Sequence, residues 1–369
     1  MTAALTRADD APTGGLRASA RRGTTRALTT YGGLSKQILA RGLLARRRGF
    51  YWTRITTGVL AFAACWVGFW LLGDSWAQLG VAAALAVVLH QFAFLGHDGA
   101  HRQIFASARW NEWFGRIFAG LFAGLGYSWW LSKHNKHHGA PNQLGRDSDI
   151  ESTVFAFHDE AGRGRPRGVR AWFVRRQGWF FFPLLPFEGV SLHIDSFRRL
   201  LHPDPVKRRW IDLSFMTLRL GGYVAVLFLV LSPGMAAAFL ATQLGVFGLL
   251  MGLSFAPNHV GMPIINETTK VDFLRRQVLT SRNISGGWLI DLFMGGLNHQ
   301  VEHHLFPSMP RPNLRQARPI VRQFCAEHGI AYTETSLIQS FGEIVHYLND
   351  VGIRARDPFS CPLKAQLQI

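Results

Sequence analysis

Four apolar stretches, each close to the roughly 20 residues that a membrane-spanning helix needs, constrain this chain more than any other feature. Such a helix covers about 30 Å of hydrocarbon, which is the thickness of a bilayer core. The stretches fall into two pairs, with the short links "GDSW" and "SPG" inside the pairs. The sequence therefore predicts an all-α integral membrane protein with two transmembrane hairpins. The expected spans are residues 55–72, 76–96, 213–231 and 235–255.

The basic residues lie in the segments that flank these stretches. The formal net charge is +17, and residues 1–50 carry ten Lys or Arg against two Asp. Basic flanks favour the cytosolic side of a membrane, and neither short link contains Lys or Arg. We therefore expect the links to be external, and the active site and both termini to be cytosolic. A high positive charge can also indicate a protein that binds nucleic acid. We disfavour that function here because the basic residues flank membrane-length apolar stretches.

The segment Phe114–Leu131 is long enough to span a membrane, yet it is rich in glycine and contains Arg116. It separates the histidine motifs "HDGAH" (97–101) and "HNKHH" (134–138), which could not share a metal site across a bilayer. We expect it, like the shorter Trp179–Val190, to be interfacial or re-entrant. Amphipathic patterns further on predict soluble helices that cap the cytosolic face, and these cover Asn313–His328 and Thr335–Leu348.

Three histidine clusters use the same helical spacing. "HNKHH" and "NHQVEHHLFP" (298–307) place polar side chains at i, i+3 and i+4 on one helix face, and "HDGAH" places two histidines at i and i+4. One first-row metal ion accepts at most about six ligands, so eight neighbouring imidazoles imply two metals. A zinc hydrolase needs only three protein ligands and a water, so eight histidines are too many for that class of enzyme. Imidazole ligation beside an apolar domain suits a redox-active pair that uses dioxygen on a hydrocarbon. The candidate ligands are His97, His101, His134, His137, His138, His303 and His304, with His259 after the last span.

Several neighbours of these clusters are expected to support the metal ligands. Carboxylates in or beside the clusters should accept hydrogen bonds from the far ring nitrogens and so orient the rings. His90, about two helical turns before His97, could be a further buried partner. His299 and Gln300 both stand within one turn of His303, so either could face the site but hardly both. Trp129 and Trp130 are expected to anchor the membrane interface. The supporting carboxylates are Asp98, Asp147, Asp149 and Glu302.

The motifs resemble those of the membrane fatty acid desaturases. The match runs through "GYSWWLSKHNKHHGAPN" (126–142), "DSD" (147–149) and "GGLNHQVEHHLFP" (295–307), and covers roughly residues 55–345. Each of the three histidine clusters corresponds to a histidine box of that family. Glutamine at the first position of the third box, within "NHQVEHHLFP", resembles the front-end and related acyl-lipid or linoleoyl-CoA desaturases. The resemblance implies that the eight histidines bind two irons. It also implies that Gln300, rather than His299, joins them as a metal ligand.

The resemblance implies the activity as well. A membrane lipid or acyl-CoA would receive a cis double bond in its long acyl chain, with O2 and two electrons consumed. The sequence contains no HPGG motif of a fused cytochrome b5, so a separate ferredoxin or cytochrome b5 type donor is expected. The expected organisation is a basic disordered arm (1–50), a desaturase domain (51–345) and a C-terminal tail (346–369).

Two other functions are less well supported by the sequence. A lipid or carotenoid hydroxylase uses similar histidine boxes, but the glutamine in the third box and the "HHGAPN" context argue against it. A histidine-rich metal transporter would need polar residues along its spans to form a path. Nearly the only such residues here are His90, Gln91 and Gln243.

Overall fold

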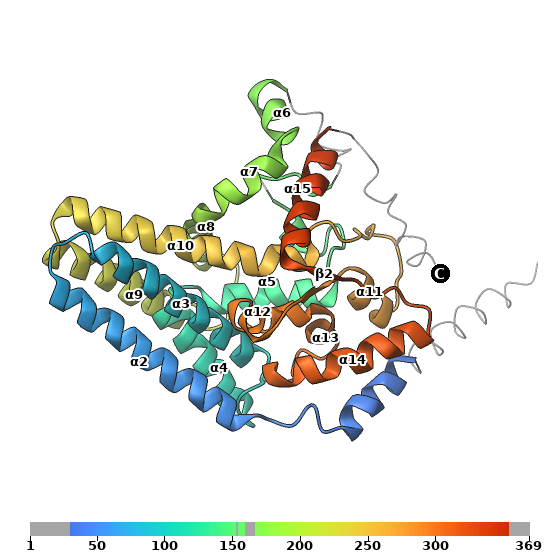
Figure 1. Cartoon of the computed structure of the whole chain (residues 1–369). Coiled ribbons are helices and arrows are strands. Elements are labelled where there is room, and N and C mark those ends of the chain that lie inside the picture. Colours follow the sequence, from blue (N-terminus) through green and yellow to red (C-terminus); the bar gives the residue numbers. More distant parts are fainter. Residues whose placement is uncertain (1–29, 153, 159–166, 354–369) are drawn as a thin grey trace, which may run out of the picture.

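The computed structural model describes residues 30–152, 154–158 and 167–353, and it is predominantly helical (Figure 1). Four of the described helices are long and apolar enough to cross a membrane. α3 lies inside this bundle, with 56% of its apolar window buried, whereas α2 has 6% buried and presents its side chains outward. An outward apolar surface is what lipid contact requires. The four helices are α2 (Arg48–Leu72), α3 (Gln78–Ala100), α9 (Arg209–Val230) and α10 (Pro233–His259).

The loops within the two helix pairs lie at the same end of the bundle, on the left of Figure 1. The Ser232 hydroxyl of one loop donates a hydrogen bond to Asp74 of the other, with an O–O distance of 3.1 Å. Most of the remaining helices gather at the opposite end. Two helices continue beyond the expected spans at that end, α3 to Ala100 and α10 to His259. Polar residues begin there while the helical backbone continues, so apolar length alone underestimated both helices.

The glycine-rich segment 114–131 forms no single long helix. It is divided among α4 (Ala108–Arg116), the π-helical η1 (Ile117–Phe122) and α5 (Tyr127–Gly139). The chain reverses at Gly124, whose φ of +79° is a left-handed conformation that favours glycine. As a result, the histidines before and after the segment lie at the same end of the molecule.

A helical cap covers the end of the bundle opposite the short loops. The predicted soluble helices are present as α14 (Arg311–Glu327) and α15 (Leu337–Ile353). The all-α expectation missed one small parallel sheet, because its two three-residue strands are too short to show an alternating pattern. The other cap elements are η2 (Ser148–Ile150), α6 (Gly168–Val174), α7 (Gln177–Leu184), η3 (Leu185–Phe187), α8 (Glu188–Leu201), α11 (Phe273–Leu279), β1 (Asn283–Ser285), α12 (Trp288–Phe293), η4 (Leu297–His299), α13 (Gln300–Leu305) and β2 (Glu334–Ser336).

Residues 30–50 are folded, so the expectation of a disordered arm is wrong for this part. Residues 30–40 are helical, and Leu34 and Ile38 are fully buried in a core that includes side chains of α14. The Tyr31 hydroxyl donates a hydrogen bond to the carbonyl of Leu305 at 2.8 Å. These three side chains form an i, i+3, i+7 stripe that the basic composition concealed. Residues 1–29 and most of the predicted tail lie outside the described residues.

Candidate metal centre

The eight predicted histidines converge where the bundle meets the cap, and they form two groups. In each group the candidate ligand nitrogens all lie within 4.8 Å of one another. We call the larger one the five-histidine group; it contains His97, His101, His134, His138 and His303. We call the smaller one the three-histidine group; it contains His137, His259 and His304.

Two helices supply both groups, because adjacent residues of an α-helix point about 100° apart. On α5, His134 and His138 share one face, and His137 turns to the other group. On α13, the neighbours His303 and His304 divide in the same way. The ends of α3 and α10 complete the five- and three-histidine groups, respectively. The two groups are therefore adjacent and share their supporting helices.

The spacing of the ring nitrogens fits metal ligation. The Nε2 atoms of His101 and His134 are 2.8 Å apart, and those of His138 and His134 are 3.0 Å apart. In the smaller group, the Nε2 atoms of His137 and His259 are 3.3 Å apart. Two imidazoles bound at right angles to one ion, each about 2.1 Å from it, have nitrogens roughly 3 Å apart. Metal ligands therefore occupy this range of separations naturally.

Several ring nitrogens in the two groups are buried without a hydrogen-bond partner. Leaving a buried polar group unsatisfied costs about 1–3 kcal/mol, so a concentration of such groups calls for a compensating ligand. These atoms are His97 Nε2, His138 Nδ1, His303 Nδ1 and Nε2, and His304 Nε2. A cation in each group would satisfy the one nitrogen of a ring that faces it, because an imidazole binds a given ion through a single nitrogen.

The electrostatics also favour neutral imidazole, which is the form that binds metals. Burial, together with neighbouring histidines, holds the pKa of His134, His138 and His303 well below the usual value. His137 differs from these. Burial lowers its pKa, but the charge of Asp147 and its hydrogen bond raise the pKa overall.

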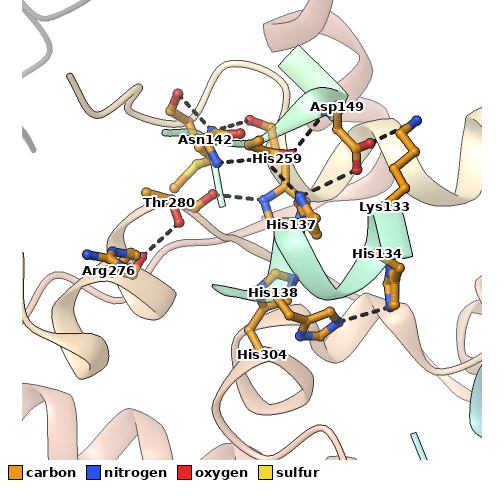
Figure 2. Close-up of polar contacts among 12 residues, drawn as sticks. Lys133, His134, His137, His138, Asn142, Asp149, His259, Arg276, Thr280 and His304 are labelled. Carbon is orange, nitrogen blue, oxygen red and sulfur yellow. Dashed lines mark hydrogen bonds and ion pairs between the residues drawn. The ribbon is translucent and has the colours of Figure 1, made fainter. Parts of the chain in front are cut away.

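The far nitrogens of the three-histidine group are held by three different acceptors. Asp147 accepts a hydrogen bond from His137 Nδ1 at 2.9 Å, and the Oδ2 atom of Asp149 lies 3.4 Å from the same nitrogen. Figure 2 shows the second acceptor, the carbonyl of Thr280, which is 3.0 Å from His259 Nδ1. The third is the side-chain oxygen of Gln277, 2.8 Å from His304 Nδ1.

In the five-histidine group, Asp98 is the predicted carboxylate that contacts a ring. Its Oδ1 atom is 3.3 Å from His97 Nδ1, and its Oδ2 atom forms an ion pair with Arg311 at 2.6 Å. Trp130 stacks on His134, with ring centroids 4.5 Å apart and planes at 17°. Trp130 was expected at the membrane interface, but its ring covers one of the clustered histidines.

Three residues expected beside the histidines have other partners. Glu302 lies on the face of α13 that points to β1, where Asn283 and Tyr332 donate hydrogen bonds to it at 2.7 and 2.8 Å. Burial raises the pKa of Glu302. His90 pairs with the Ser254 hydroxyl at 3.1 Å. His299 faces Asp291, with its Nε2 atom 3.2 Å from the Oδ1 atom of the carboxylate.

Gln300 faces the three-histidine group, in contrast to His299. Its Nε2 atom lies 2.9 Å from the Nε2 atom of His259, and its Oε1 atom accepts a hydrogen bond from Asn258 at 3.3 Å. The oxygen is the ligating atom of an amide, so metal binding would reverse this amide group. The reversal is a rotation of the side chain alone, because the two amide orientations have nearly the same shape.

Sequence spacing missed the acceptors Gln277 and Thr280, because they lie on or beside α11, far from every histidine motif. Both precede the small strand β1, in a segment without a recognisable motif. Only the three-dimensional contact with His304 and His259 reveals them.

A cavity of about 630 Å³ opens beside the two groups, between α5, α8 and α10. This volume is typical of a small-molecule site. Four of the candidate metal ligands line it: His134, His137, His259 and Gln300. Its apolar lining includes Phe181, Leu184, Leu185, Met251 and Phe255. Its charged lining includes Lys133, Asp149, Glu188, Asp195 and Arg198.

Comparison with known proteins agrees with this arrangement. The model of the fatty acid desaturase family matches residues 74–336. An acyl-lipid (9-3)-desaturase of Physcomitrium patens is 29% identical over 84% of this chain and 60% of its own length. A Delta(8)-fatty-acid desaturase of Helianthus annuus is 26% identical over 81% of this chain and 68% of its own length. An acyl-lipid 8-desaturase of Rebecca salina is 31% identical over 67% of this chain and 57% of its own length.

The chain thus spans only about 57% to 68% of the length of these relatives. The family match nevertheless covers most of the chain, and it includes all eight clustered histidines. The chain belongs to the fatty acid desaturase family.

Proposed function

We propose that this chain is an integral membrane desaturase that introduces a cis double bond into a long acyl chain. The observation that carries the proposal is the pair of histidine groups at the wall of a largely apolar cavity. Family membership and the activities named for the relatives support it. The reaction would consume O2 and two electrons from a separate donor of the ferredoxin or cytochrome b5 type.

Two irons are proposed as the cofactors. The five-histidine group would hold one ion, and the three-histidine group together with Gln300 would hold the other. The unpaired buried nitrogens and the lowered pKa values support this fit. When bound, the irons would supply the O2-dependent oxidation that removes two hydrogens from adjacent carbons.

The protein's own residues would position the acyl chain and the ligands. The apolar side chains of α7, η3 and α10 would bind the acyl chain and exclude water from the reacting carbons. Asp147, Thr280 and Gln277 would keep three rings in fixed orientations. Trp130 would shield His134 on the side where the rings stack.

The proposed topology has the histidine end of the bundle, and both termini, in the cytosol. The support is the distribution of basic residues, since the loops 73–77 and 231–232 lack Lys and Arg, whereas residues 46–48 are all arginine. In a cysteine-free active variant, cysteines placed at Ala106 and Asn135 should be labelled from the cytosolic side. A cysteine at Asp74 should be labelled from the opposite side. Labelling of Ala106→Cys and Asn135→Cys from different sides would contradict the topology.

The activity is tested by expressing the full chain in a host that lacks polyunsaturated fatty acids, followed by mass spectrometry of derivatised fatty acids. The expected product is a new cis double bond at a defined position, absent from cells that carry His303→Ala at equal expression. A hydroxylated acyl chain without a new double bond would instead assign the chain to hydroxylation.

A further inference from the structure

The cavity has two chemically different walls. Along α10, Phe255 and Met251 precede His259 by four and eight residues, so the apolar wall extends about 6 and 12 Å from it along the helix axis. The other wall, formed by α5, α8 and η2, carries the charged side chains. A cavity of this kind suits a ligand with a long apolar part and one polar group.

Lys133 lines the cavity on α5, one position before His134. Its Nζ atom is 2.9 Å from Asp149 Oδ1, and Asp149 Oδ2 is 3.4 Å from His137 Nδ1. Figure 2 shows this arrangement, with the Asp149 carboxylate between the lysine and the imidazole. A single carboxylate therefore separates the ammonium group from the three-histidine group.

The ammonium group has donors beyond the one that Asp149 uses. An ammonium carries three N–H donors, and the side chain of Lys133 is 35% exposed where it lines the cavity. The other cation of this wall, Arg198, has a side chain that is 77% exposed and pairs with Asp195. Lys133 is thus the cation placed at the histidines, whereas Arg198 is open to solvent.

We propose that Lys133 is a specificity-determining residue that donates a hydrogen bond to the acyl carbonyl oxygen of the substrate. This inference rests on the proposed desaturase function and names the residue that holds the polar end of the substrate. An acyl ester and an acyl thioester both present this oxygen, so both would be recognised in the same way.

The position of the new double bond follows from this anchor. With the carbonyl held at Lys133, a fixed number of carbons lies between it and the histidines. Additional carbons at the methyl end would extend along the apolar wall of α10. The double bond should therefore keep its distance from the carbonyl when the acyl chain is lengthened.

The experiment uses the full chain in cells fed with fatty acids that differ only in length at the methyl end. The wild-type chain should place the double bond at one carbon counted from the carbonyl, whatever the length. In Lys133→Met the fraction of products with the bond at other carbons should rise about tenfold or more, as expected for the loss of a charged hydrogen bond. Lys133→Arg should restore the wild-type position, and iron content should be equal in all three proteins.

Lys207→Met is the matched control, because Lys207 also pairs with a carboxylate, Glu112 at 3.4 Å, but lies on the surface away from the cavity. It should leave the position unchanged. A wild-type double bond that keeps its distance from the methyl end overturns the proposal. So does a Lys133→Met protein that loses activity, in part or entirely, without new positional isomers, because the lysine would then only hold Asp149. Absence of any desaturation by the wild-type chain would instead refute the proposed function.

Discussion

The two histidine groups differ in how the protein supports them. In the three-histidine group each far nitrogen has an acceptor: Asp147 for His137, the Thr280 carbonyl for His259 and Gln277 for His304. In the five-histidine group His303 has neither ring nitrogen paired and His138 Nδ1 is also unpaired, while the rings pack on one another. Every ring of the smaller group has an acceptor, whereas in the larger group Asp98 contacts His97 but His303 has no hydrogen-bond partner.

The groups also differ in their access to the cavity. The cavity is lined by two histidines of the smaller group, His137 and His259, and by Gln300 beside them. His134 is the member of the larger group that lines it. Most residues at the cavity thus belong to the group whose rings have acceptors, and most histidines of the other group lie behind them. If each group holds an ion as proposed, the larger group would do so by the number of its imidazoles and the smaller one by their fixed orientation.

Removing one ligand from each group should have the largest effect. His303→Ala and His304→Ala are adjacent on α13 but belong to different groups. Both should reduce desaturation to background, because a ligand mutant loses redox function. Iron analysis separates them: His304→Ala should lose one equivalent more completely, since only two other histidines remain in its group. Equal iron loss in both variants would remove the distinction between the groups.

Disturbing α5 as a whole should affect both groups together. Arg116 is buried and forms an ion pair with Asp212 on α9, and Asp212 also accepts a hydrogen bond from the backbone N–H of Ser128 at 2.8 Å. Breaking a buried pair by removing one partner costs about 3–5 kcal/mol. Arg116→Met should lower the free energy of unfolding by that amount, measured by denaturant titration in detergent. A change below about 1 kcal/mol, the level of an exposed pair, would contradict this role.

Changing an acceptor should disturb one group and spare the other. Asp147→Asn keeps the shape of the side chain but loses the charge that holds His137 Nδ1. Loss of such a partner typically costs about 10- to 100-fold in metal affinity or activity. Iron titration should show weakened binding of one equivalent only. The matched variant Asp195→Asn, at a half-exposed carboxylate of the cavity wall, should bind both equivalents normally. Weakening of both equivalents by Asp147→Asn would mean that the groups are not independent.

The smallest effect is expected at His299. Its ring faces Asp291, whereas Gln300 faces His259. Gln300→Ala should abolish desaturation, and His299→Ala should retain substantial activity at equal expression. The comparison is read from product yield in the same host. If His299→Ala were inactive and Gln300→Ala active, His299 rather than Gln300 would be the metal ligand of the third box.

The sequence predicted the parts of the site that depend on helical spacing. The i, i+3 and i+4 offsets identified every clustered histidine except His259, since ligands on one helix face must repeat at that period, whereas His259 stands alone after the last span. The same reasoning failed for Glu302, which lies on the opposite face of α13 and bonds to β1. Gln277 and Thr280 could not be predicted, because their contacts join segments without a shared pattern.

The fold was predictable to a similar degree and for similar reasons. Apolar length identified the four long helices, but not the last turns of α3 and α10, where polar residues continue the helix. Composition suggested disorder before residue 50, whereas Leu34 and Ile38 pack into the core beside α14. A short buried stripe within a basic segment is visible only once its partner helix is known.

The central claim is that the two groups hold two irons, and it is tested most directly by metal analysis of the purified, fully active chain. We predict two iron equivalents per chain, which chelation should remove together with the activity. A single equivalent in fully active protein, or stoichiometric zinc without iron, would contradict it.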